Sequence, residues 1–140
     1  MAPRILIDLN VVVDALNRRE PFFEASAAVL AAAESGRIEG WLAAHSVTTL
    51  FYLIARNTSP AAARVHLTRL EQFLKIAAVD GRTIEQALAL PYKDFEDAVQ
   101  MMAAVHAGVE YVVTSDLSGF KAGPLPVLSP PELLAMLRRN

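Results

Sequence analysis

Short apolar runs and stretches with helical periodicity alternate along the chain. The apolar runs of strand length lie at residues 4–7, 40–44, 76–79, 111–114 and 126–128. Apolar residues recur at helical spacing over 10–16, 21–34, 47–57, 60–74, 83–90 and 94–107, and again after Ser129. Strands that alternate with helices favour a parallel sheet covered on both faces. We therefore predict an α/β protein, a three-layer α/β/α domain with a mainly parallel central sheet.

Length and composition fit one globular unit. The chain has 140 residues, of which 54% are hydrophobic and 20% are charged. A chain of this length can form one domain around one core, and no repeat, charge block or Gly/Ser-rich linker divides it. This composition excludes disordered and collagen-like chains. We expect residues 1–140 to form a single domain.

The residue types that are absent narrow the possible chemistry. The sequence has no Cys, which excludes disulfides, thiolate metal sites and a cysteine nucleophile. No apolar stretch reaches the roughly 18–20 residues of a membrane span, and the run after Arg4 is too short for a secretory signal. We therefore expect a cytoplasmic protein without a membrane partner. The net charge of −2 argues against a broad cationic surface for nucleic acid.

Two aspartates follow predicted strands. Asp8 ends the strand at 4–7, and Asp116 comes two residues after the strand at 111–114. Ligands of open parallel sheets collect beyond the carboxyl ends of the strands. Either aspartate alone is explained equally well as a helix cap or a turn former. A third acidic segment favours a shared site.

That third segment lies at 94–97, where a predicted helix begins. Helical geometry places Asp94 and Asp97 on the side of the apolar stripe and Glu96 on the opposite side. If Asp8, Asp97 and Asp116 met at about 5 Å, each like-charged pair would cost on the order of 3 kcal/mol. A cation between them would remove this cost. Without cysteine or paired histidines, the ion that suits carboxylate ligands best is Mg²⁺ or Mn²⁺.

Three short segments resemble the successive signatures of PIN domains. They are ILIDLN at 5–10, DFEDA at 94–98, and TSD at 114–116 followed by Phe120. Their order, the chain length and the α/β alternation are also similar to that family. The resemblance covers essentially the whole chain and is strongest to the small ribonuclease toxins of bacterial toxin–antitoxin systems (VapC-like).

The resemblance implies a Mg²⁺- or Mn²⁺-dependent endoribonuclease that cleaves RNA phosphodiester bonds by metal-activated water. The catalytic residues would be Asp8, Asp97 and Asp116, and the same three together with Asp94 would bind metal. Asn10, Thr49 and Thr114 would support them. The resemblance further implies an RNA substrate, an antitoxin protein as partner, and a homodimer.

One position departs from the family pattern. The helix after the second strand usually carries a glutamate, and Thr49 stands at that position in this sequence. Either Asp94 substitutes for the missing carboxylate or the ion is bound weakly. The alternative function is a PIN-like domain with impaired catalysis that acts by binding RNA or a protein. A third hypothesis, phosphoryl transfer on an aspartate, is weaker because no acid follows Asp8 by two residues.

The arginine pairs at 18–19 and 138–139 leave two interpretations open. Guanidinium groups bind phosphates well, so either pair could contact an RNA backbone. Paired arginines are equally typical of a solvated helix end.

Overall fold

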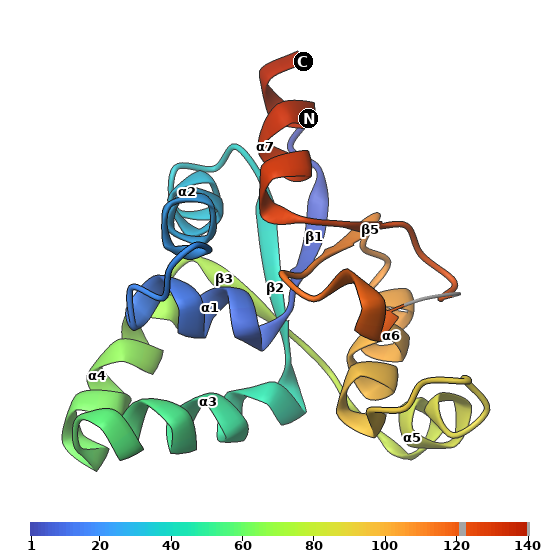
Figure 1. Cartoon of the computed structure of the whole chain (residues 1–140). Coiled ribbons are helices and arrows are strands. Elements are labelled where there is room, and N and C mark those ends of the chain that lie inside the picture. The colour runs from blue at the N-terminus through green and yellow to red at the C-terminus, as the bar shows by residue number, and fades with distance from the viewer. Residues whose placement is uncertain (121–122, 140) are drawn as a thin grey trace.

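A five-stranded parallel sheet forms the centre of the molecule. The computed structural model describes residues 1–120 and 123–139. The strands are β1 (Arg4–Ile7), β2 (Glu39–Ala43), β3 (Leu74–Ala77), β4 (Tyr111–Val113) and β5 (Val127–Leu128). Their order in the sheet is β3-β2-β1-β4-β5, and every neighbouring pair is parallel (Figure 1). The predicted parallel sheet is confirmed.

The edge strand β3 begins two residues earlier than the apolar run predicts. Its pairing with β2 starts at Leu74 and ends at Ala77. Leu74 and Ala77 are buried, whereas Ile76 is 39% exposed. The strand therefore buries only some of its side chains, and hydrogen bonding to β2, rather than the continuous apolar run, sets its limits.

Seven α-helices of the described residues cover the sheet. They are α1 (Leu9–Leu16), α2 (Phe23–Glu34), α3 (Ala44–Asn57), α4 (Pro60–Glu71), α5 (Gly81–Ala87), α6 (Phe95–Ala107) and α7 (Pro130–Arg139). A single 3₁₀ turn, Leu117–Phe120, was not predicted. Within the described ranges, no helix has both the length and the apolar character that crossing a membrane requires.

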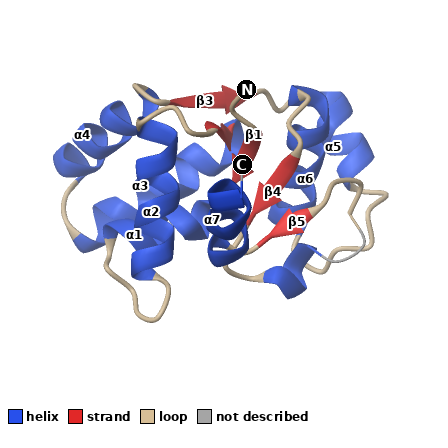
Figure 2. Cartoon of the chain, turned by 90° about the horizontal axis from the view of Figure 1, so that it is seen from above, coloured by secondary structure: helices blue, strands red, loops and turns tan. Residues whose placement is uncertain are grey.

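The two faces of the sheet bury separate apolar cores. Ile5 and Ile7 of β1 point to one face and pack in a core built with α1, α2, α3, α4 and α7. Leu6 points to the other face and packs with Met101 of α6. Figure 2 shows α1 to α4 on one side of the sheet and α5 with α6 on the other. This arrangement confirms the predicted three-layer α/β/α architecture.

Local signals at both ends fix the helix that carries the acidic segment. Asp94 caps α6, since its Oδ1 accepts a hydrogen bond from the Glu96 backbone N–H at 2.9 Å. Gly108 ends the helix in the left-handed conformation, with φ of 74°, which glycine adopts without steric cost. The helix therefore starts beside the carboxyl edge of the sheet and presents its first turn there.

The direction of the chain switches between β1 and β4, and near this switch a crevice of about 450 Å³ is lined by Asp94, Asp97 and Asp116. From β1 the chain proceeds outward to β2 and β3, and it then returns to the other side of β1 to form β4 and β5. Ile7 pairs with Val113, so the residues that follow the two strands lie next to each other. This switch in direction is where open α/β sheets bind ligands.

Gly40 provides a test of how closely α2 and β3 approach β2. A Cβ atom on Gly40 would lie 2.6 Å from Leu74 Cδ2 and 3.2 Å from the Ala33 Cβ. We expect Gly40→Ala to lower the free energy of unfolding by about 1–3 kcal/mol because the packed layers must separate. Urea denaturation measures the change, with Gly81→Ala as control, since no atom lies within 4 Å of a Cβ at Gly81. Equal stability of the two variants would contradict the tight packing.

Candidate functional site

Asp8 is the buried centre of the crevice. It follows β1, is only 1% exposed, and immediately precedes α1. The Thr114 hydroxyl donates to Asp8 Oδ2 at 2.7 Å, and the Gln100 amide donates to Asp8 Oδ1 at 3.0 Å. Burial raises the pKa of Asp8, while these two hydrogen bonds oppose the increase. The carboxylate is therefore held by one group from beyond β4 and one from α6.

Gln100 joins two of the predicted site residues. Its Nε2 lies 3.0 Å from Asp8 Oδ1 and 3.4 Å from Asp97 Oδ1. Gln100 is fully buried, and its Oε1 has no hydrogen-bond partner among the residues that the structure describes. The sequence analysis missed this residue. The available signal was a polar residue one helical turn after Asp97 within an otherwise apolar stretch.

Asp97 experiences the combined negative charge of the site. Partial burial raises its pKa to about 7, and the charges of Asp8, Asp94, Asp116 and Glu96 contribute to the increase in that order. A carboxyl group with such a pKa is partly protonated near neutral pH. The raised pKa shows that the acidic residues from β1, α6 and the segment after β4 act on one another.

Asp116 closes the site from the segment after β4. Its backbone N–H donates to the Thr114 hydroxyl at 3.0 Å, and the Ser118 hydroxyl donates to Asp116 Oδ1 at 2.7 Å. A Cβ atom on Gly119 would lie 2.8 Å from Asp97 Oδ2 and 3.4 Å from Asp116 Oδ2. The two carboxylate oxygens therefore flank a space that remains open because Gly119 has no side chain. The sequence analysis did not single out Gly119.

Thr49 and Glu96 form a contact that helical spacing did not predict. Glu96 was expected to point away from the site, yet the Thr49 hydroxyl donates to its Oε2 at 2.9 Å. His45 Nε2 also lies 3.1 Å from the Glu96 backbone oxygen. The difference arises because α3 passes beside the first turn of α6, so the side opposite the apolar stripe still faces protein. The charge of Glu96 contributes to the raised pKa values of both Asp8 and Asp97.

Of the remaining predicted residues, Asp94 and Asn10 lie at the border of the site and Thr114 lies inside it. Asp94 is exposed, and its carboxylate caps α6. Asn10 is exposed in the first turn of α1. Thr114 is buried and links Asp8 to Asp116 through its hydroxyl. The structure thus brings Asp8, Asp97, Asp116 and Thr114 together, while Thr49 contacts Glu96.

The chemistry of the donor set fits a hard divalent cation. Among residues 1–120 and 123–139, no three carboxylate or imidazole side chains are grouped closely enough to hold a metal ion as they stand. The open space beside Gly119 nevertheless lies between two carboxylates, and all of the available donors are oxygens. Oxygen donors are those that Mg²⁺ and Mn²⁺ prefer. Asp8, Asp97 and Asp116 are the residues that could hold such an ion after small side-chain movements.

Comparison with protein families identifies the fold family. A family model described as a PIN domain matches residues 4–118. The chain belongs to the PIN-domain family. PIN domains are generally nucleases that use divalent metal ions, in agreement with the acidic crevice. A search of curated proteins found no match.

Solved structures with the same fold include several toxins. A toxin–antitoxin complex from Klebsiella pneumoniae has a TM-score of 0.69 and 19% identity, with 90% of this chain and 97% of that chain covered. FitAcB from Neisseria gonorrhoeae has a TM-score of 0.66 and 23% identity over the same shares of each chain. VapC20 of Mycobacterium tuberculosis, described as a Sarcin-Ricin loop cleaving toxin, has a TM-score of 0.64 and 15% identity, with 84% and 95% covered. This PIN domain therefore shares its fold with these proteins over 84–90% of its length.

The raised pKa of Asp97 predicts a pH-dependent stability. Since the pKa is about 7 in the folded protein and about 3.9 for an unfolded aspartate, the folded state binds the additional proton between these values. This contribution is fully present below about pH 4 and is lost as the pH rises through about 7. We expect the melting temperature to fall between pH 5 and pH 8, and to fall less for Asp97→Asn.

Thermal melts at both pH values measure this difference. Glu71→Gln is the control, because it neutralises an exposed carboxylate at the end of α4, outside the site. An Asp97→Asn protein with the same pH dependence as the wild type would show that Asp97 does not carry the shifted pKa.

Proposed function

We propose that this PIN domain is a metal-dependent endoribonuclease that hydrolyses RNA phosphodiester bonds and acts as the toxin of a toxin–antitoxin pair. The convergence of Asp8, Asp97 and Asp116 in the crevice between β1 and β4 is the observation that carries the proposal. The description of one structural neighbour as a Sarcin-Ricin loop cleaving toxin supports the choice of RNA.

Asp8, Asp97 and Asp116 are the proposed ligands of Mg²⁺ or Mn²⁺, and Asp94 lies at the border of the site. When bound, such an ion activates water and stabilises the charge that develops on the phosphodiester. Thr114 and Gln100 keep Asp8 in place, and Gln100 also orients Asp97. Asp97 must release its proton to ligate a cation, so metal affinity increases as the pH rises through about 7.

The proposal includes protein partners. One of the structural neighbours is described as a toxin–antitoxin complex, and we propose a similar antitoxin here. We also propose that the chain forms a homodimer in the cytoplasm. Tyr52 of α3 is 79% exposed and could contribute to such an interface, because a large aromatic side chain is unfavourable in water.

A second candidate function is binding without catalysis. It is favoured by the hydroxyl at Thr49 and by the lack of a preassembled metal-binding group among the described residues. In this case the same crevice would bind RNA or a protein, and added metal would have little effect on the protein.

Cleavage of RNA distinguishes the two functions. We expect the wild-type protein to degrade a mixed RNA pool in Mn²⁺, and Asp97→Asn to lose at least 100-fold in rate, since positioned charges contribute effects of roughly this size. Gel analysis after incubation with and without EDTA measures the reaction. We also expect Mn²⁺ to raise the melting temperature of the wild type, by linkage. No cleavage and no thermal shift would favour the binding-only function.

Glu96 is the proposed replacement for the carboxylate that position 49 lacks. Its side chain is bonded by Thr49, and its charge acts on both Asp8 and Asp97. No lysine, arginine or histidine forms an ion pair with Glu96 in the described part of the chain. A carboxylate could therefore reach this place from either of two helices. It would come from α3 if position 49 were a glutamate, and it comes from α6 through Glu96.

A carboxylate exchange tests the role of Glu96. We expect Glu96→Gln to weaken Mn²⁺ binding by about tenfold, which corresponds to the loss of about 1.4 kcal/mol. The double variant Thr49→Glu/Glu96→Gln should recover most of the affinity, because a carboxylate returns to the same contact. Calorimetric titration measures both, and Glu71→Gln serves as the matched control. Unchanged binding in Glu96→Gln, or failure of the double variant to recover while remaining folded, would exclude this replacement.

A further inference from the structure

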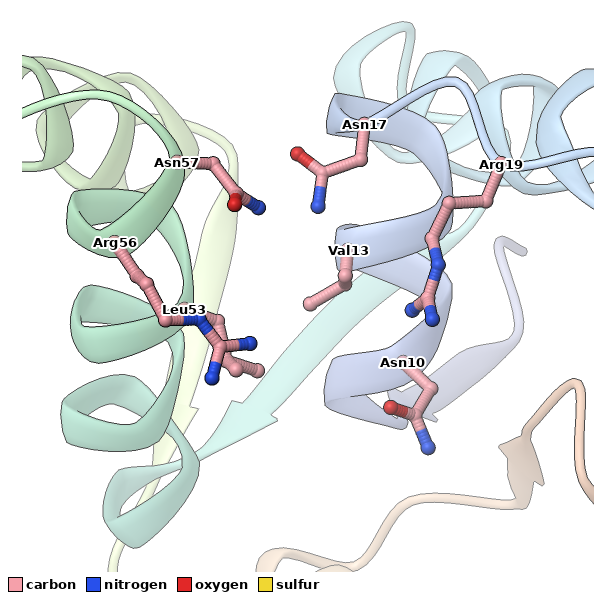
Figure 3. A pocket seen from close by; sticks show the side chains of 7 residues that line it. All are labelled: Asn10, Val13, Asn17, Arg19, Leu53, Arg56 and Asn57. Carbon is pink, nitrogen blue, oxygen red and sulfur yellow. The ribbon is translucent and has the colours of Figure 1, made fainter.

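A groove between α1 and α3 contains two guanidinium groups and no carboxylate. Its volume is about 510 Å³. Arg56 lies on α3, and Arg19 follows α1 on the opposite side of the groove (Figure 3). Three amide side chains, Asn10, Asn17 and Asn57, complete the polar part of the lining. The groove therefore has the opposite charge to the acidic crevice.

The two guanidinium groups of the groove differ in whether a carboxylate of the protein pairs with them. Arg56 forms no ion pair among the residues that the structure describes. Arg19 has one acidic neighbour, Asp14, at the long distance of 3.6 Å. Both arginines are exposed. The Arg56 guanidinium therefore remains available for an anion, and planar guanidinium groups bind phosphate through paired hydrogen bonds.

The groove leads to the acidic crevice. A neighbouring depression of about 490 Å³ shares Asn10 and Arg19 with the groove and extends to Ser115 and Asp116. Asp14, Glu20 and Phe22 also line this depression, so in the described part of the chain Arg19 is the one cationic group among its acidic residues. A chain-like ligand could thus lie along α1, with one part at Asp116 and another at Arg56. A single small anion would use only one of these places.

Two apolar side chains form the remaining surface of the groove. Val13 of α1 and Leu53 of α3 point toward each other from the two helices (Figure 3). An apolar surface beside amides and guanidinium groups matches an unpaired nucleotide, which has a flat base, polar edges and a phosphate. A base that is paired in a duplex could not reach such a surface, whereas single-stranded RNA presents its bases freely.

We propose that this groove binds the phosphate and base of a single-stranded RNA next to the bond that is cleaved at the acidic crevice. This inference rests on the proposed ribonuclease function. It places the RNA strand along α1, between Asp116 and Arg56. Arg56 contacts a phosphate, the asparagine amides bond to the sugar or base edges, and the partly exposed Leu53 contacts the base, since Val13 is only 4% exposed. The contacts select single-stranded RNA through its backbone and its exposed bases.

Binding of labelled RNA to Arg56→Gln tests the groove. Fluorescence anisotropy is measured with a mixed-sequence single-stranded RNA in EDTA, which suppresses metal-dependent cleavage, at several salt concentrations. We expect Arg56→Gln to bind at least fivefold more weakly than the wild type. The slope of log affinity against log salt should also fall by about 0.7, as for the loss of one phosphate contact to a single strand.

The control is Arg69→Gln, which removes an exposed arginine of α4 that does not line the groove. Circular dichroism verifies that both variants are folded. If the wild type binds RNA and the two variants bind it equally well, the groove assignment is wrong and the ribonuclease proposal stands. If the wild type neither binds nor cleaves RNA, both are wrong. If Arg56→Gln retains RNA but loses affinity for a labelled glutamate-rich peptide, the groove binds an acidic protein segment and the RNA assignment is overturned.

Discussion

The buried carboxylate of Asp8 is the constraint on which the rest of the site depends. A carboxylate that is removed from water needs hydrogen-bond donors, because an unpaired buried charge costs several kcal/mol. Thr114 and Gln100 supply those donors from the segment after β4 and from α6. The same two bonds therefore satisfy Asp8 and hold three elements of the fold together. The position of the Asp8 carboxylate is therefore fixed before any ligand reaches the crevice.

The electrostatic cost of this arrangement is distributed over several groups. Asp97 retains its proton to an unusually high pH, and Gln100 places N–H groups between two carboxylates. Glu96 is bonded by a hydroxyl rather than by a cation. These contacts moderate the repulsion without neutralising it. Such residual strain is typical of functional sites, where the unbound protein gives up stability for affinity.

Much of this structure could be predicted from the sequence, and the failures have a common cause. The apolar periodicity was sufficient to predict the three layers and the parallel sheet. The position directly after a strand was sufficient to single out Asp8 and Asp116 as candidates. Helical spacing was not sufficient for Glu96, because it orients a side chain around its own helix and says nothing about α3. The register of β3 depends on β2 for the same reason. Gln100 and Gly119 act through partners that only the tertiary structure brings near.

Because Gly119 has no side chain, the space between two carboxylates of the crevice stays open. One methyl group at this position would occupy the space between Asp97 and Asp116, because its nearest carboxylate oxygen would lie at 2.8 Å. The Asp97 carboxylate would have to shift, whereas the number of acidic residues and the overall charge of the protein would be the same. A substitution that adds only volume would thus close the site. The charge that attracts a cation and the space that admits it are therefore set by different residues.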